Sequence, residues 1–170
     1  QQAIQLKCAK TGKVYIDKKQ IKAFLESLDA VQCHLDFETC SFAIPEFQGT
    51  RSYQRIPFQF SLHVVPGKHF EYLHDGKDDP RPAFLAALKK MLPATGSVVV
   101  YSQGFESSVL KELARDFPEY TDWVASVLER IVDLREPFSS FSYYNPQQHG
   151  SASIKKVLPA LVGKGYEGFD

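Results

Sequence analysis

The sequence carries no net charge, has few cysteines and contains no long apolar run. Its 20 basic and 20 acidic side chains cancel, so charge does not support a surface that coats nucleic acid. Three cysteines without a CxxC pair argue against a disulfide framework and a zinc site, and they favour a reduced, cytoplasmic setting. Without a charged-then-apolar leader or a bilayer-length apolar stretch, neither a signal peptide nor a membrane partner is expected.

The chain has enough apolar residues to form a hydrophobic core of its own. Its length is 170 residues, of which 44% are apolar, and we predict a single domain spanning residues 1–170. Because the sequence begins at Gln1 without a methionine and stops at Asp170, we expect a fragment of a longer protein with further domains. No oligomeric state follows from the sequence.

Apolar periodicity predicts the order of strands and helices. Period-two patterns predict strands at residues 13–16, 31–38, 58–65 and 69–74. Helical spacing predicts helices at 17–28, 83–92, 106–117, 121–128 and from Ser153 onward. An apolar run at 98–100 and a short segment at 131–134 complete the strands. This order predicts an α/β fold whose mixed sheet has three antiparallel strands followed by parallel strands, with helices on its faces.

The strand at 31–38 contains the first candidate site. Its alternation places Cys33 and Leu35 on one face and Asp36 and Glu38 on the other. Two carboxylates on one side of a strand suit hard cations, and we expect two Mg²⁺ or Mn²⁺ ions. The simpler interpretation is the solvated face of an amphipathic strand.

A second acid follows the buried strand at 98–100. Ligands of open α/β sheets bind beyond the carboxyl ends of such strands, and Glu106 lies there at the start of a predicted helix. An acid in the first turn of a helix is also favourable without any ligand, because it complements the helix dipole. Three neighbours of the acids are predicted to contact substrate, namely Thr39, Tyr101 and Phe105.

Aromatic and basic residues supply candidate contacts to single-stranded DNA or RNA. Stacking and backbone contacts of this kind are expected from Tyr144, His149 and Lys155, in the segment before the last predicted helix. The loop after the acidic strand adds Arg51 and Tyr53, with Arg55 beside them. A solvated loop is the alternative there, and capping of the last helix by Ser151 or Ser153 is the alternative for the later segment.

Together these motifs resemble the DEDD 3′–5′ exonucleases, a group with the ribonuclease H-like fold. The string LDFET, with Asp36 and Glu38, matches the first motif of that group, and Phe105-Glu106 fits the second with Glu in place of Asp. The sequence is still more similar to a bacterial domain of unknown function assigned to the same group, with strings such as FQGTRSYQRIPFQFSLHV and GSASIKKVLPAL.

The resemblance implies hydrolysis of phosphodiester bonds by two metal ions. Asp36 would bridge both ions, Glu38 would bind the ion that activates water, and Glu106 would hold the other. The group also needs a fourth acid, for which Asp170 and Asp133 are candidates, although Asp133 also suits a structural role at a strand end. Glu in place of Asp at position 106, and the lack of an acid within the last helical pattern, favour the alternative of a non-catalytic nucleic-acid-binding or docking module; an endonuclease of the same fold is a further alternative.

Overall fold

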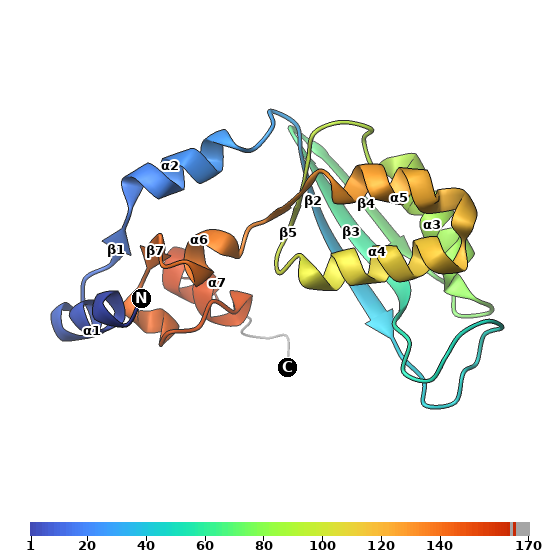
Figure 1. Ribbon diagram of the computed structural model, residues 1–170, viewed down its shortest axis with the longest axis horizontal. Helices are drawn as coiled ribbons and strands as arrows, with labels where there is room; N and C mark the ends of the chain where they lie inside the picture. The colour runs from blue at the N-terminus through green and yellow to red at the C-terminus, as the bar shows by residue number, and fades with distance from the viewer. Residues whose placement is uncertain (164, 166–170) are drawn as a thin grey trace. The chain divides into compact units, whose positions relative to one another are not determined.

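The computed structural model describes residues 1–163 and 165, and these fall into two compact units. The sheet unit is Asp29–Asp133, and the terminal unit combines Gln1–Leu28 with the chain from Leu134 onward (Figure 1). Among the described residues, no helix has both the length and the apolar content needed to cross a membrane.

A five-stranded mixed sheet forms the centre of the sheet unit, with strand order β4-β3-β2-β5-β6. Its strands are β2 (Gln32–Cys40), β3 (Ile56–Val65), β4 (Lys68–Leu73), β5 (Ser97–Val100) and β6 (Ile131–Asp133). β4, β3 and β2 are antiparallel neighbours, whereas β5 pairs in parallel with both β2 and β6. The predicted α/β class with a mixed sheet flanked by helices is therefore confirmed.

One face of this sheet is apolar and packs against helices. Cys33, Leu35 and Phe37 of β2 are buried, while Asp36 and Glu38 between and beyond them are exposed, as the alternation predicts. Three helices contribute to the same core, namely α3 (Pro80–Met91), α4 (Gly104–Asp116) and α5 (Thr121–Leu128). The burial of this face fixes the register of β2, because a slip of one residue would place its carboxylates in the core.

Phe84 of α3 lies at the centre of that core. Its ring is fully buried and meets Phe37 and Phe60 edge to face, with ring centroids 5.2 and 5.5 Å apart. Helix α3 begins three residues earlier than the apolar spacing predicts. The Asp79 side chain accepts a hydrogen bond from the Arg81 amide, and Pro80 occupies the first turn, where its missing N–H costs nothing.

A buried arginine attaches the loop between β2 and β3 to the helices. Arg81 is 3% exposed and binds Asp79, Asp116 and the carbonyl oxygen of Gln48, at 2.7, 2.9 and 3.2 Å. In the same network the Gln54 amide donates to Asp116 at 2.6 Å. Because Gln48 and Gln54 belong to the loop, this network fixes the loop along α3 and α4.

The terminal unit is built from segments at both ends of the chain. Its elements are α1 (Gln2–Thr11), β1 (Tyr15–Ile16), α2 (Lys18–Glu26), α6 (Glu136–Ser139), β7 (Tyr143–Tyr144), the 3₁₀ turn Pro146–Gln148 and α7 (Ile154–Val162). A second 3₁₀ turn, Pro118–Tyr120, belongs to the sheet unit. β1 pairs antiparallel with β7, and Cys8, Phe141 and Tyr144 form a small core. Helix α1 is absent from the sequence prediction.

Helices α2 and α7 begin differently. Asp17 caps α2, since its side chain accepts hydrogen bonds from the amides of Lys19 and Gln20. Ser153 occupies the N-cap position of α7, but its side chain makes no capping bond. Instead the Ser151 hydroxyl accepts from the Ser153 amide at 3.1 Å. The expectation of a serine side-chain cap on α7 is therefore wrong, because that hydroxyl orders the turn before the helix.

Candidate functional site

Three acids lie near the carboxyl ends of the parallel strands β5 and β6, where the pairing between β5 and β2 also stops. Asp36 lies two residues beyond His34, the last β2 residue paired with β5. Asp133 is the last residue of β6 and lies opposite Val100, the last residue of β5. Glu106 is in the first turn of α4, the helix that follows β5. This is the edge at which open α/β sheets bind ligands.

Glu106 is the most unusual acid of the group. Its side chain is 2% exposed, and its Oε2 atom has no hydrogen-bond partner. The pKa of this carboxyl is raised from 4.5 to about 7, mainly by burial and to a lesser degree by the negative charges of Asp36 and Asp133, while a hydrogen bond from its own backbone amide opposes the shift. Burial and the nearby acids thus make ionisation of Glu106 unfavourable unless a cation approaches.

Asp36 and Glu38 are both exposed on β2. Partial desolvation raises the pKa of Asp36, and the Phe37 amide offsets part of that effect. The register between β2 and β3 shifts between Glu38 and Thr39, and Thr39 is half-buried opposite Pro57. Irregularities of this kind re-aim side chains and are common beside active sites.

Asp133 holds the beginning of α4 in place. Its carboxylate accepts hydrogen bonds from the amides of Ser102 and Gln103, at 2.8 and 3.2 Å. Gln103 is the N-cap residue of α4, and its own side chain makes no capping bond. Asp133 thus acts as a cap supplied from a neighbouring strand. Tyr101, half-buried at the end of β5, lies directly before this turn.

Carboxylate oxygens and one buried oxygen without a partner suit a hard divalent cation. The acids are nonetheless not assembled around a single point. Within residues 1–163 and 165, the His, Cys, Asp and Glu side chains that place three ligand atoms within 4.8 Å of one another are His74, Asp75 and Asp78. Asp36 and Asp133 therefore act on the ionisation of Glu106 without forming a closed ligand cage with it.

The loop between β2 and β3 brings basic side chains to α4. The guanidinium of Arg55 lies 5.2 Å from the centre of the Phe105 ring and donates to the Ser108 hydroxyl at 2.8 Å. Arg51 pairs with Glu112 at 2.7 Å. Phe105, one of the residues predicted to contact substrate, therefore lies beneath the guanidinium of Arg55. It directly precedes Glu106 in the sequence.

The other predicted substrate contacts lie away from these acids in sequence and differ in exposure. Tyr53 is 74% exposed, with a backbone φ of 57°. Tyr144 is buried in the core of the terminal unit, where its hydroxyl accepts from the Gly150 amide at 3.1 Å. His149 and Lys155 belong to the same unit and are exposed. The candidate fourth acid Asp170 lies outside the described residues.

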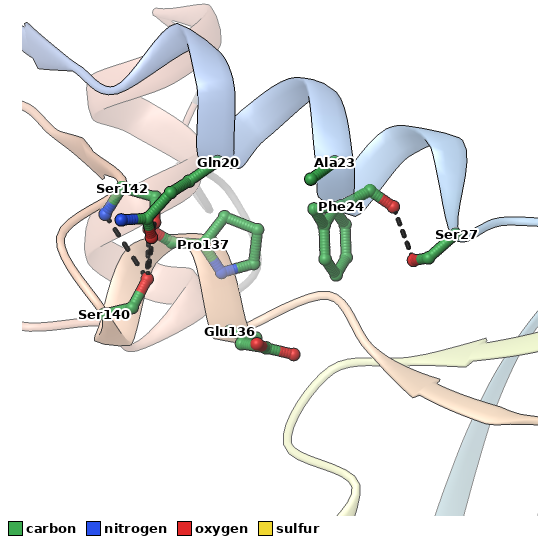
Figure 2. A pocket seen from close by; sticks show the side chains of 8 residues that line it. All are labelled: Gln20, Ala23, Phe24, Ser27, Glu136, Pro137, Ser140 and Ser142. Atoms are coloured by element: carbon green, nitrogen blue, oxygen red, sulfur yellow. Dashed lines mark hydrogen bonds between the residues drawn. The ribbon is translucent and has the colours of Figure 1, made fainter.

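A pocket of about 360 Å³ lies in the terminal unit. Figure 2 shows its lining residues, Gln20, Ala23, Phe24, Ser27, Glu136, Pro137, Ser140 and Ser142. The Ser142 hydroxyl donates to the Gln20 amide oxygen at 2.8 Å and lies 2.8 Å from the Ser140 hydroxyl. These polar groups satisfy one another, and the lining includes no predicted site residue.

Sequence reasoning did not identify Arg81 or Asp116, although both hold the loop between β2 and β3, which carries Arg51 and Arg55, in its position. Arg81 directly follows the proline that opens α3, and arginines at such positions are usually solvated. Only its 3% exposure and its contacts to residues far apart in sequence mark it as structural. No local pattern in the sequence indicates these contacts.

Comparison with known proteins identifies a family. No curated protein and no solved structure matches the chain. One family model matches residues 33–153, which is more than half of the chain and includes Asp36, Glu38, Glu106 and Asp133. The chain belongs to the family described as a domain of unknown function, DUF2779.

Proposed function

We propose that the chain is a metal-dependent nuclease domain that cleaves phosphodiester bonds of single-stranded DNA or RNA, as a 3′–5′ exonuclease. The observation that carries this proposal is the buried, unpartnered carboxyl oxygen of Glu106 beside the charges of Asp36 and Asp133. An acid buried among acids is unstable when ionised, unless a cation neutralises the group. A site of this kind favours a divalent ion over water.

The strand order supports a ribonuclease H-like fold for this domain. Three antiparallel strands precede two parallel strands, and the first long strand carries Asp36 and Glu38 at the centre of the sheet. The matched family agrees with the sequence resemblance to a bacterial domain of unknown function. Fold alone does not determine activity, so the proposal depends on the acids.

In this proposal Asp36, Glu38 and Glu106 hold Mg²⁺ or Mn²⁺. When bound, such ions lower the pKa of a water molecule and stabilise charge on the attacking and leaving oxygens. Asp133 is a positioning residue, because its bonds to the amides of Ser102 and Gln103 fix the turn that carries Glu106. Arg55, held over Phe105, supplies positive charge for a phosphate near the acids.

An assay with end-labelled single strands and Mn²⁺ tests the proposal. The wild type should shorten the labelled strand from its 3′ end. Asp36→Asn and Glu106→Gln should each lower the rate of shortening by at least about a hundredfold, since both remove charge at the reacting centre. Glu129→Gln is the matched control, because Glu129 is exposed at the end of α5. Equal activity in the wild type and Asp36→Asn would refute the assignment.

A catalytically inactive docking or nucleic-acid-binding module is the second candidate. It is favoured by the finding that, in the described part of the chain, the acids at this edge do not place three ligand atoms within 4.8 Å of one another. Calorimetric titration with Mn²⁺ separates the two candidates. The nuclease requires saturable Mn²⁺ binding that Asp36→Asn abolishes, whereas an inactive module would bind single strands equally well in EDTA.

A further inference from the structure

Three histidines form a row on the sheet face opposite the helix-covered core. His34 of β2 pairs in register with His63 of β3, and His63 pairs in register with His69 of β4. Side chains directly opposite on neighbouring strands point to the same face, with Cβ atoms about 5 Å apart. The row lies on the face that also carries Asp36, because His34 and Asp36 are two residues apart on one strand.

His63 and His69 form the closest pair in this row. Their rings are stacked, with centroids 4.0 Å apart and an angle of 10° between the ring planes. Both residues are exposed, so an ion can reach them from solvent. Two imidazole nitrogens bound to one tetrahedral ion lie roughly 3.4 Å apart, given metal–nitrogen bonds of about 2.0–2.1 Å. In the stacked arrangement the nitrogen lone pairs lie in parallel ring planes, so the rings must turn out of the stack for both nitrogens to face one ion, and the exposure of both side chains leaves room for that rotation.

The charges around this pair favour a cation over a phosphate. On this face the charged residues of β2, β3 and β4 are Asp36, Glu38 and Glu71. Lys68, the basic residue of these strands, lies opposite Val64 and so projects toward the other face. The Ser61 hydroxyl is 3.3 Å from His69 Nε2 and adds an oxygen donor.

We propose that His63 and His69 chelate one divalent transition-metal ion on the open face of the sheet. Imidazole ligands select Zn²⁺, Co²⁺, Ni²⁺ or Cu²⁺, whereas Mg²⁺ and Ca²⁺ prefer oxygen. The site uses different ligands from the proposed Mg²⁺ or Mn²⁺ site, although Asp36 lies opposite Ser61 on the same face, and it does not depend on nuclease activity.

The cluster of His74, Asp75 and Asp78 is a less suitable metal site, although three of its ligand atoms lie within 4.8 Å of one another. His74 Nδ1 accepts a hydrogen bond from the Gly76 amide at 3.0 Å, which leaves the proton on Nε2, 3.0 Å from Asp78. The ammonium of Lys77 lies 2.6 Å from Asp75. These groups are satisfied without an ion, and His74 therefore provides a matched control.

Calorimetric titration of the metal-stripped chain with Ni²⁺ tests the proposal. The Asp36→Asn variant, which lacks the proposed carboxylate site, is titrated beside the wild type so that the two sites are measured separately. Asp36→Asn should still bind one Ni²⁺ per chain, with an affinity lowered only by the loss of one nearby negative charge. His63→Ala and His69→Ala should each weaken binding on the order of tenfold to a hundredfold, the scale seen when even supporting residues of metal ligands are lost. His74→Ala should leave the affinity unchanged.

Cu²⁺ spectroscopy supplies a second measurement on the same variants. Electron paramagnetic resonance should show two coordinated imidazole nitrogens in the wild type and one in each single variant at His63 or His69. Absence of saturable Ni²⁺ binding, unchanged affinity in either variant, or loss of binding in His74→Ala would each overturn the proposal. Failure of nuclease activity with intact Ni²⁺ binding would refute only the proposed function.

Discussion

The clearest physical prediction concerns the stability of the sheet unit when Glu106 is replaced by Gln. The folded pKa of Glu106, about 7, lies above the ordinary value of 4.5. This group therefore favours the folded state most at low pH, and its contribution is lost as the pH rises through 7. Glu106→Gln keeps the shape of the side chain and removes the ionisation.

The magnitude follows from the pKa shift. Each pKa unit corresponds to about 1.4 kcal/mol, so the shift from 4.5 to about 7 gives a penalty of about 3 kcal/mol for folding at high pH. Between pH 5 and pH 8 the variant should gain about 2 kcal/mol in unfolding free energy relative to the wild type, because part of the shift already acts at pH 5.

The single tryptophan makes this measurement direct. Trp123 packs against Tyr120 in the sheet unit, so its fluorescence during urea unfolding in EDTA reports on that unit. Glu129→Gln is the control and should show no dependence of its effect on pH. Adding Mn²⁺ at pH 8 should stabilise the wild type more than Glu106→Gln. A difference between variant and wild type that stays constant from pH 5 to pH 8 would refute the reasoning about the buried carboxyl.

Three further substitutions test the packing. Arg81→Met should cost about 3 kcal/mol by urea unfolding, since Asp116 loses a partner that is 3% exposed; a cost below about 1 kcal/mol would show that the network is dispensable. Phe84→Ala should lower the free energy of unfolding by about 3–5 kcal/mol in the same assay, because it leaves a cavity beside Phe60. We expect this loss to be at least as large as that of Arg81→Met, and a smaller loss would contradict the central place of Phe84 in the core. Asp17→Ala should reduce the helical circular dichroism of the chain and its stability by about 1 kcal/mol, through loss of the α2 cap; no change in either signal would mean that the cap is unimportant.

The local sequence was sufficient to predict the strands and helices of the sheet unit. Alternation in β2 places Asp36 and Glu38 on the polar face, and the apolar run at 98–100 identifies a strand that is buried in full. The turn at Pro66-Gly67 also implies which residues of the hairpin face each other. His63 and His69 are equally distant from Pro66, so the sequence of the hairpin implies that they pair.

Helix α1 shows where local patterns fail. It has one buried residue, Cys8, and its remaining residues give no apolar stripe, so periodicity had no signal to detect. The loop from Cys40 to Ile56 likewise has no period, and its course depends on Arg81 and Asp116. Contacts between residues so distant in sequence produce no local pattern from which they could be predicted.

The sequence by itself determined the α/β class, the order of strands and helices along the chain, and the shared face of Asp36 and Glu38. These follow from apolar periods of two and 3.6 residues. Only the tertiary structure decided that both ends of the chain form one unit. It also decided that one carboxyl oxygen of Glu106 is buried without a hydrogen-bond partner near two other acids, and that Asp133 caps α4. The physical reason is that burial and electrostatic coupling depend on which segments meet in space, whereas periodicity depends only on neighbours along the chain.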